Sequence, residues 1–419
     1  MSSTTHARNR SGAPAMAIEC GRRGQTQAVI CYGPPGRGGR SVGAPLREFT
    51  EEFPMLHTLL VGLGRSGREL HLPVLRRLRQ SDREAGAGAL FAPASPLGYD
   101  IAPLSDGTSV PGLLTVPSPE AARTHLDPDT TVVHVCTPPT ERVEVIAAFA
   151  ELGFRRYLVE KPIGTGAATV DALRDLRDRY GLRLAVVAPW LHSGLTERLE
   201  RIVTSRGLGG LRRITIHQRK PRLRRSLATP SHPTAFDVEL PHSVGVALRL
   251  AGAAQVERAS WTDARTDTTV IPRMGTAELT LRHHGGAVSR IATDLASPLR
   301  ERSIVLDFEA GTAVGHYPVS GEDPYAHLRI APTGRPERHE VFPDEALDAC
   351  LHQVYRRFAE GADFTDDFEL QARVVDVLER AKHRAATADP ADPANSTAGT
   401  ADGSTAATTA TGEEHRHVA

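Results

Sequence analysis

The part of the sequence that most constrains the fold runs from Leu59 to Leu78 and reads LLVGLGRSGRELHLPVLRRL. A short apolar run stops at Gly62, glycines recur at Gly64 and Gly67, and an amphipathic helical pattern then begins. Gly62 permits a tight turn, Gly64 lets another group approach the backbone, and Gly67 lets the helix pack close to the strand. A strand that passes directly into a helix in this way is typical of a parallel sheet covered by helices.

The G-x-G-x-x-G spacing, with Arg65 and Ser66 before the third glycine, predicts a niche for a dinucleotide. The helix that follows would direct free N–H groups and the positive end of its dipole at the phosphates. A turn with close packing and no ligand is the alternative. The pattern also requires an acid at the end of the second strand, and Asp100 in GYDIAP is the candidate. Its carboxylate would bind the ribose hydroxyls and repel a 2′-phosphate, which predicts NAD rather than NADP, unless Asp100 belongs to an ordinary turn.

The rest of the chain divides into four parts by pattern. Residues 1–54 and 387–419 are rich in Ser, Thr, Gly, Ala and Pro without periodicity, which predicts disorder. Residues 55–188 alternate buried strands with helices, which predicts a doubly wound parallel sheet. Residues 189–386 contain successive strand-like runs separated by glycine turns, which predicts a largely antiparallel open sheet with helices on one face.

Composition excludes several function classes. Lys plus Arg and Asp plus Glu both total 50 of the 419 residues, so the chain has no overall basic field for nucleic acid. No apolar stretch approaches the roughly 18 residues of a membrane span. The cysteines match no zinc or disulfide framework, which predicts a cytoplasmic protein without a bound metal; they are Cys20, Cys31, Cys136 and Cys350.

A second group of candidate residues follows two later strands. The runs VVHVCTPP and RRYLVEKP end at Thr137-Pro138 and at Glu160-Lys161. Ligands bind at the carboxyl ends of parallel strands, so Lys161 is expected beside the bound dinucleotide. A lysine in a niche of low dielectric, next to a cationic nicotinamide, would have a lowered pKa and could exchange a proton with an alcohol. A surface lysine beside a proline is the alternative.

Residues 55–386 resemble the Gfo/Idh/MocA oxidoreductase family, through the motifs GLGRSGRELHLPVL, VCTPP, EKP and GLGGLRRITI. The resemblance implies a Rossmann domain followed by an α+β domain, bound NAD or NADP, redox chemistry on sugars or cyclitols, and dimers or tetramers. It assigns the catalytic lysine to Lys161. It also places Glu160 near the nicotinamide ribose, and Thr137 and Pro138 along the cofactor.

The family carries an aspartate and a histidine four residues apart at a helix start, and the corresponding stretch here is FDVELPHSVGVALRLAG. His242 fits the histidine, but Val238 occupies the acid's position, with Asp237 and Glu239 on either side. We interpret Glu239 and His242 as the changed pair, with His242 exchanging a proton and Glu239 orienting it or binding substrate, as Asp237 could also do. A dipole-stabilised acid and a packed histidine are the alternative.

Weaker signals concern the substrate. The basic run RKPRLRR, residues 219–225, indicates either an anionic small-molecule substrate or a solvated loop. Trp190 and His192 follow the last strand of the first domain, where an aromatic ring could stack on a sugar or pack at the domain junction.

We therefore expect an NAD-dependent dehydrogenase or reductase that acts on a secondary alcohol or ketone of a sugar, cyclitol or amino-sugar derivative. Two alternatives stay open on the sequence: an enzyme that retains NAD and catalyses elimination or hydrolysis, and a non-catalytic sensor that binds the dinucleotide.

Overall fold

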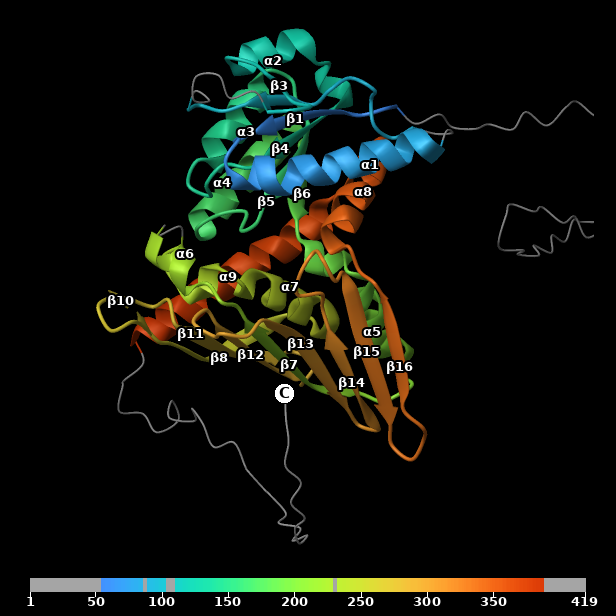
Figure 1. The fold of residues 1–419 in the computed structure, drawn as a ribbon, viewed down its shortest axis with the longest axis vertical. Coiled ribbons are helices and arrows are strands. Elements are labelled where there is room, and N and C mark those ends of the chain that lie inside the picture. The colour runs from blue at the N-terminus through green and yellow to red at the C-terminus, as the bar shows by residue number, and fades with distance from the viewer. Residues whose placement is uncertain (1–53, 86–88, 103–109, 229–231, 388–419) are drawn as a thin grey trace, which may run out of the picture. The chain divides into compact units, whose positions relative to one another are not determined.

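The computed structural model describes residues 54–85, 89–102, 110–228 and 232–387, all within one compact unit of the chain, Glu52–Ala419 (Figure 1). The predictions of disorder for the two ends fall on residues outside these ranges, apart from Pro54 and Thr387.

The first half of the described chain forms a parallel six-stranded sheet in the order β3-β2-β1-β4-β5-β6. Its strands are β1 (His57–Val61), β2 (Leu97–Tyr99), β3 (Leu114–Thr115), β4 (Thr131–Val135), β5 (Arg156–Glu160) and β6 (Arg183–Val187). Every residue of β4 is buried, as expected for a central strand with both faces covered. Helices connect the strands: α1 (Leu72–Ala85), α2 (Pro119–His125), α3 (Arg142–Glu151) and α4 (Ala167–Tyr180). This half confirms the predicted doubly wound sheet.

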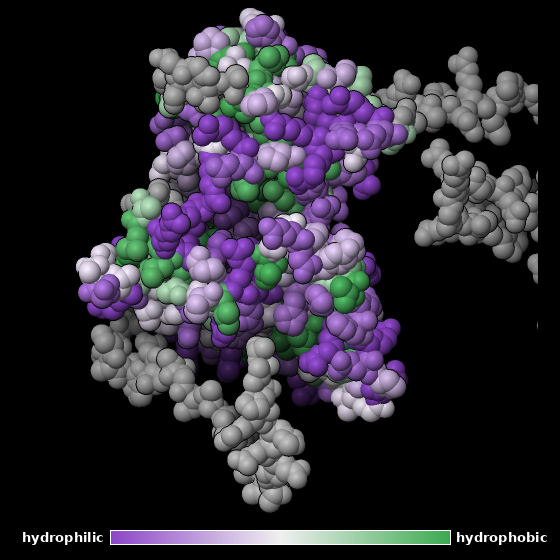
Figure 2. Space-filling model, viewed as in Figure 1, coloured by the Kyte–Doolittle hydropathy of each residue, from purple (hydrophilic) through white to green (hydrophobic). Residues whose placement is uncertain are grey.

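The helix after the glycine loop begins with a π-helical turn, Ser66–His71, and continues as α1. Pro73 is the second residue of α1 and lies where the π-helical turn passes into the α-helix; it has no N–H to donate to the preceding turn. The apolar side of α1 is buried, and hydrophilic residues cover its outer side (Figure 2). The amphipathic pattern therefore positions the helix start over the end of β1.

The second sheet has eight strands in the order β16-β15-β14-β13-β7-β12-β11-β8. They are β7 (Leu211–Arg219), β8 (Ala254–Trp261), β11 (Thr276–His283), β12 (Val288–Asp294), β13 (Glu301–Phe308), β14 (Gly311–His316), β15 (Tyr325–Pro332) and β16 (Arg338–Pro343). Only the pair of β7 and β12 is parallel among these neighbours, which confirms a largely antiparallel sheet. The short strands β9 (Ala264–Arg265) and β10 (Val270–Ile271) pair separately, and helices α5 (Gly194–Ser205), α6 (Leu223–Ala228) and α7 (Leu240–Ala251) accompany the sheet.

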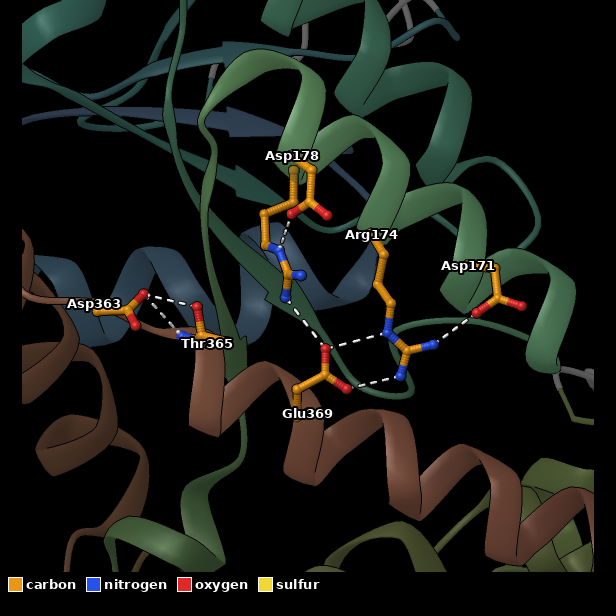
Figure 3. A network of polar contacts seen from close by, with 7 residues as sticks. Asp171, Arg174, Asp178, Asp363, Thr365 and Glu369 are labelled. Carbon is orange, nitrogen blue, oxygen red and sulfur yellow. Dashed lines mark hydrogen bonds and ion pairs between the residues drawn. The ribbon is translucent and has the colours of Figure 1, made fainter.

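Two C-terminal helices contact the first sheet as well. Helix α8 (Ala346–Ala359) packs on α1 and β6, while α9 (Thr365–Thr387) packs on β8 and α7 and also on β6 and α4. Glu369 of α9 pairs with Arg174 and Arg177 of α4 (Figure 3). The last part of the chain thus helps to build the region around β5 and β6.

None of the helices in the described ranges is long and apolar enough to cross a bilayer, and the same residues contain no cluster of side chains suited to a metal ion.

Candidate functional site

The glycine loop after β1 has the geometry that its spacing predicts. Gly62 has φ +92°, and a Cβ there would lie 2.9 Å from the carbonyl carbon of Cys136. A Cβ on Gly67 would lie 2.3 Å from the carbonyl oxygen of Gly62. A Cβ on Gly64 would meet no atom within 4 Å, so space lies open beside the backbone. Two glycines are thus required by packing, and the third borders the space that a pyrophosphate needs.

Asp100 follows β2 and reaches back to this loop. Its Oδ2 accepts a hydrogen bond of 2.6 Å from the backbone N–H of Leu63, and Oδ1 accepts one of 2.9 Å from Ala102. The carboxylate therefore lies beside the glycine loop, where a ribose ligand would be needed. Arg65 is exposed and pairs with Glu69 at 2.9 Å.

The loops that follow β4 and β5 are joined by Arg142. This buried guanidinium donates to the carbonyl oxygens of Thr137 and Pro162, and burial lowers its pKa to about 10. The Thr137 hydroxyl is buried without a hydrogen-bond partner among the described residues, although such groups are almost always paired in native proteins. Together with the open space at Gly64, this orphan oxygen fits a polar cofactor at the same sheet edge. Pro138 follows directly, and its carbonyl accepts from Glu141.

Lys161 lies at the carboxyl end of β5, and its Nζ donates to the carbonyl oxygen of Val238 at 3.3 Å. Burial lowers the pKa of Lys161, while the charges of Glu160 and Glu239 partly oppose that shift. Lys161 and His242 line one small cavity, together with Trp190 and neighbouring apolar side chains. Lys161 follows β5 of the first sheet, and His242 lies in α7, which accompanies the second sheet. The structure thus brings the two side chains together at one cavity.

Glu239 and His242 lie near each other as predicted, but the Glu239 carboxylate bonds other side chains. Glu239 precedes the first residue of α7 and its carboxylate accepts from Gln218 at 3.3 Å and from Lys220, with no hydrogen bond to the His242 ring among the described contacts. His242 is therefore not oriented by Glu239; its ring stacks on Trp190, with centroids 5.7 Å apart. Burial, followed by the charge of Lys161, lowers the pKa of His242 to about 3, so the ring is neutral near pH 7.

Three residues expected near the substrate have other contacts. Trp190 also stacks on Tyr317 with centroids 4.1 Å apart and keeps only 7% of its surface exposed, which favours the packing interpretation over a sugar platform. His192 bonds Gln353 of α8 at 3.0 Å and does not line the cavity of Lys161. Asp237 caps the turn at Thr234 and pairs with Lys382 of α9 at 2.8 Å, so its carboxylate supports the entry to α7.

Glu160 faces away from the cavity. Its Oε1 accepts from Ser66 at 2.7 Å and contacts His71 Nε2 at 2.9 Å. The Ser66 hydroxyl is thus committed to Glu160 in this structure. His71 is fully buried, and its position in the helix after the glycine loop gave no sequence signal of its own.

Sequence reasoning missed several polar groups around His242. The charges of Lys220 and Arg302 both act on His242, and His232 has its pKa lowered to about 4 by burial, then by the charge of Lys161. Lys220 lay within the basic run, but Arg302 is on β13, directly opposite Gln218 of β7. Only the register of two distant strands reveals that neighbour.

Comparison with known proteins supports the fold. No protein-family model and no curated protein sequence matches the chain. Among solved structures, KijD10, a 3-ketoreductase from Actinomadura kijaniata in complex with TDP-benzene and NADP, is 14% identical, with a TM-score of 0.62 over 79% of this chain and 98% of that one.

Two further structures have the same arrangement. Levoglucosan dehydrogenase in complex with NADH and L-sorbose is 14% identical, with a TM-score of 0.62 over 79% of this chain and 96% of that chain. An NAD-binding oxidoreductase from Klebsiella pneumoniae is 12% identical, with a TM-score of 0.64 over 80% of this chain and 97% of its own. At these identities the likeness establishes a shared two-domain fold.

Proposed function

We propose that the chain is an NAD-dependent dehydrogenase or reductase that acts on a secondary alcohol or ketone of a sugar, cyclitol or amino-sugar derivative. The observation that carries the proposal is the buried amine of Lys161 at the sheet edge that also presents the open glycine loop and the orphan hydroxyl of Thr137. The proteins of similar fold that were solved with NADH or NADP support the same class.

The residues that would hold the cofactor lie at one edge of the first sheet. The backbone around Gly64 and the helix start would bind the pyrophosphate, Asp100 the adenosine ribose, and Thr137 the nicotinamide end. When bound, the nicotinamide supplies the acceptor or donor of a hydride. The Asp100 carboxylate would disfavour a 2′-phosphate, so NAD is the proposed coenzyme.

Proton transfer falls to Lys161. Because burial lowers its pKa, the amine gives up its proton more readily than an exposed lysine does, and it can take the hydroxyl proton of an alcohol or return it to a ketone. His242, with a pKa of about 3, is too weak a base for that role. Its neutral ring would instead hydrogen-bond the reacting oxygen or a neighbouring hydroxyl.

The charges around this cavity favour an acidic substrate. Lys161, Arg302 and Lys220 all act on His242 as cations, and among the described residues Glu239, which pairs with Lys220, is the carboxylate that opposes them. An unbalanced cationic cavity attracts anions, so the substrate of this proposal carries a carboxylate or phosphate beside its carbinol group. At roughly 10 Å between one of these cations and an anionic group of the substrate, and at an effective dielectric of about 20, the attraction raises kcat/KM about 10-fold over that of the neutral substrate.

The test is a screen of neutral sugars and cyclitols against their acid and phosphate derivatives, with NAD and NADP in parallel, followed at the absorbance of reduced nicotinamide. Lys161→Met is expected to lower kcat by roughly 100-fold or more, as for loss of a general base. Lys382→Met removes a lysine that pairs with Asp237 outside the cavity and is the matched control. Full activity in Lys161→Met would rule the proposal out.

A further inference from the structure

A continuous chain of buried side chains crosses the first sheet and ends at Glu160. The Thr58 hydroxyl lies 2.6 Å from the hydroxyl of Tyr355, which lies 2.8 Å from Nε2 of His134. Nδ1 of His134 lies 2.7 Å from Nδ1 of His71, whose Nε2 lies 2.9 Å from Glu160. Tyr355 belongs to α8, so the chain links a C-terminal helix to the residue before Lys161. The redox role proposed above gives these histidines no task.

With Glu160 ionised and His134 neutral, as their lowered pKa values indicate, two arrangements of protons satisfy every contact in this chain. In the first, both histidines are neutral, and every donor points toward Glu160: Thr58 to Tyr355, Tyr355 to His134, His134 to His71, and His71 to Glu160. In the second, His71 is an imidazolium that donates to both neighbours, His134 donates from Nε2 to Tyr355, and Tyr355 donates to Thr58. The two arrangements differ by one proton.

Burial of Glu160 selects the second arrangement. A buried carboxylate without a counter-charge is strongly destabilising, and His71 is the fully buried base in direct contact with it. Burial opposes the charge on His71, but Cys136 and Glu160 together raise its pKa to about 10. Burial also opposes ionisation of Glu160, yet His71, Ser66 and Lys161 lower its pKa to about 2.

Other charged groups contribute at each end of the chain. Burial, followed by the charge on His71, lowers the pKa of His134 well below its usual value, which keeps that ring neutral. Arg142 faces Glu160 and Cys136 from α3, and Arg79 of α1 acts on Tyr355. The ring of His71 itself contacts His134 through Nδ1 and Glu160 through Nε2, and the Cys136 side chain also bonds it.

We propose that Thr58, Tyr355 and His134 hold His71 as an imidazolium, and that His71, acting through Glu160, sets how readily Lys161 gives up its proton. The five side chains are positioning residues, since none of them reaches the cavity of Lys161. The proposal rests on the proposed function only in that Lys161 is taken as the base of the reaction.

The protonation states can be observed directly by NMR of the ¹⁵N-labelled histidines, assigned with His71→Asn and His134→Asn. In the wild type, His71 is expected to be doubly protonated and His134 to be the neutral Nε2–H form between pH 6 and pH 8. In Thr58→Val, the Tyr355 hydroxyl loses its acceptor and turns toward His134, which reverses the chain and leaves His71 neutral. Tyr355→Phe is expected to act in the same direction, since an unpaired N–H at His134 costs more than an unpaired lone pair. Tyr157→Phe is the matched control, because Tyr157 is a buried tyrosine of β5 that bonds the carbonyl of Phe154 at 3.1 Å.

The effect on Lys161 can be measured without turnover because the chain has only three lysines, Lys161, Lys220 and Lys382. Competitive acetylation across pH, read by mass spectrometry, gives the pKa of Lys161 in each variant. When His71 loses its charge, Glu160 acts on Lys161 without the opposing charge of His71, and the pKa of Lys161 is expected to rise by about one unit. The pH at which alcohol oxidation reaches half its maximum should rise by the same amount, with little change in KM.

A neutral His71 in the wild type would overturn the proposal, and so would an unchanged Lys161 titration in a folded variant whose His71 has become neutral. If the NMR and labelling results are as expected but no alcohol or ketone is turned over, the proposed redox function fails while the relay between His71 and Lys161 is upheld.

Discussion

Alanine substitutions at two glycines of one loop, Gly64 and Gly67, should impair the protein for opposite reasons. In Gly67→Ala the new methyl group would lie 2.3 Å from the carbonyl oxygen of Gly62, well inside contact distance, and both atoms belong to backbone that cannot turn away. Overpacking of this kind costs about 1–3 kcal/mol or more, so the helix start must shift and the free energy of unfolding should fall by that amount. In Gly64→Ala the methyl group meets nothing within 4 Å, and folding stability should change by no more than about 0.5 kcal/mol.

The same methyl group at Gly64 occupies space that the coenzyme's pyrophosphate would need. NADH affinity, measured by titration of its fluorescence, should therefore fall by about 10-fold or more in Gly64→Ala, which corresponds to about 1.4 kcal/mol. Urea unfolding of both variants supplies the stability comparison. If Gly64→Ala binds NADH as tightly as the wild type, the backbone approach at this loop is refuted. If Gly67→Ala is as stable as the wild type, the packing argument is wrong.

Three further outcomes follow from the contacts described. The lowered pKa of Glu160, about 2 in the folded chain, means that its contribution to stability is present above about pH 4.5 and is lost as the pH falls toward 2; Glu160→Gln should flatten this acid limb of the melting temperature against pH. Asp100→Asn should raise the ratio of NADP to NAD affinity, measured by coenzyme titration, because the repulsion of a 2′-phosphate is removed. Phe368→Ala should cost about 3–5 kcal/mol in urea unfolding, since Phe368 is 1% exposed, whereas Glu369→Gln should cost about 1 kcal/mol or less, as its ion pairs are partly exposed; equal losses would contradict the burial argument.

The sequence was informative wherever the physical cause is local. The turn of β1 into a helix depends on Gly62 and Gly67, whose neighbours are a few residues away in the chain or on the next strand. Helix α4 ends at Gly181 in the left-handed conformation, with φ +63°, as its glycine predicts. Lys161 was predicted at a sheet edge because strand direction alone fixes where β5 ends.

The sequence was misleading wherever a side chain's partners come from far away. Trp190 was placed correctly after β6, but nothing local indicates that Tyr317 and His242 stack on its ring. The polar neighbours of Glu239 were missed because Gln218 belongs to a strand that pairs with β13 and β12 in a register that the sequence does not encode locally. Strand β16 has no sequence signal of this kind, because five of its six residues are exposed and it therefore has no buried stripe to detect.

Glu160 and Lys161 are adjacent in sequence but lie in different environments, because side chains alternate between the two faces of a strand. Successive residues of β5 point to opposite faces, so the carboxylate of Glu160 turns into the sheet's core toward His71 while the amine of Lys161 turns toward Val238 and the cavity. A one-residue shift in register would exchange these environments, leaving an amine beside the imidazolium of His71 and a carboxylate in the cavity. The amine beside the imidazolium would be an unfavourable charge contact. The contacts of Glu160 with Ser66 and His71 therefore fix the register at the end of β5. The amine of Lys161 is not needed to hold the strand in place, so it can face a substrate in the cavity.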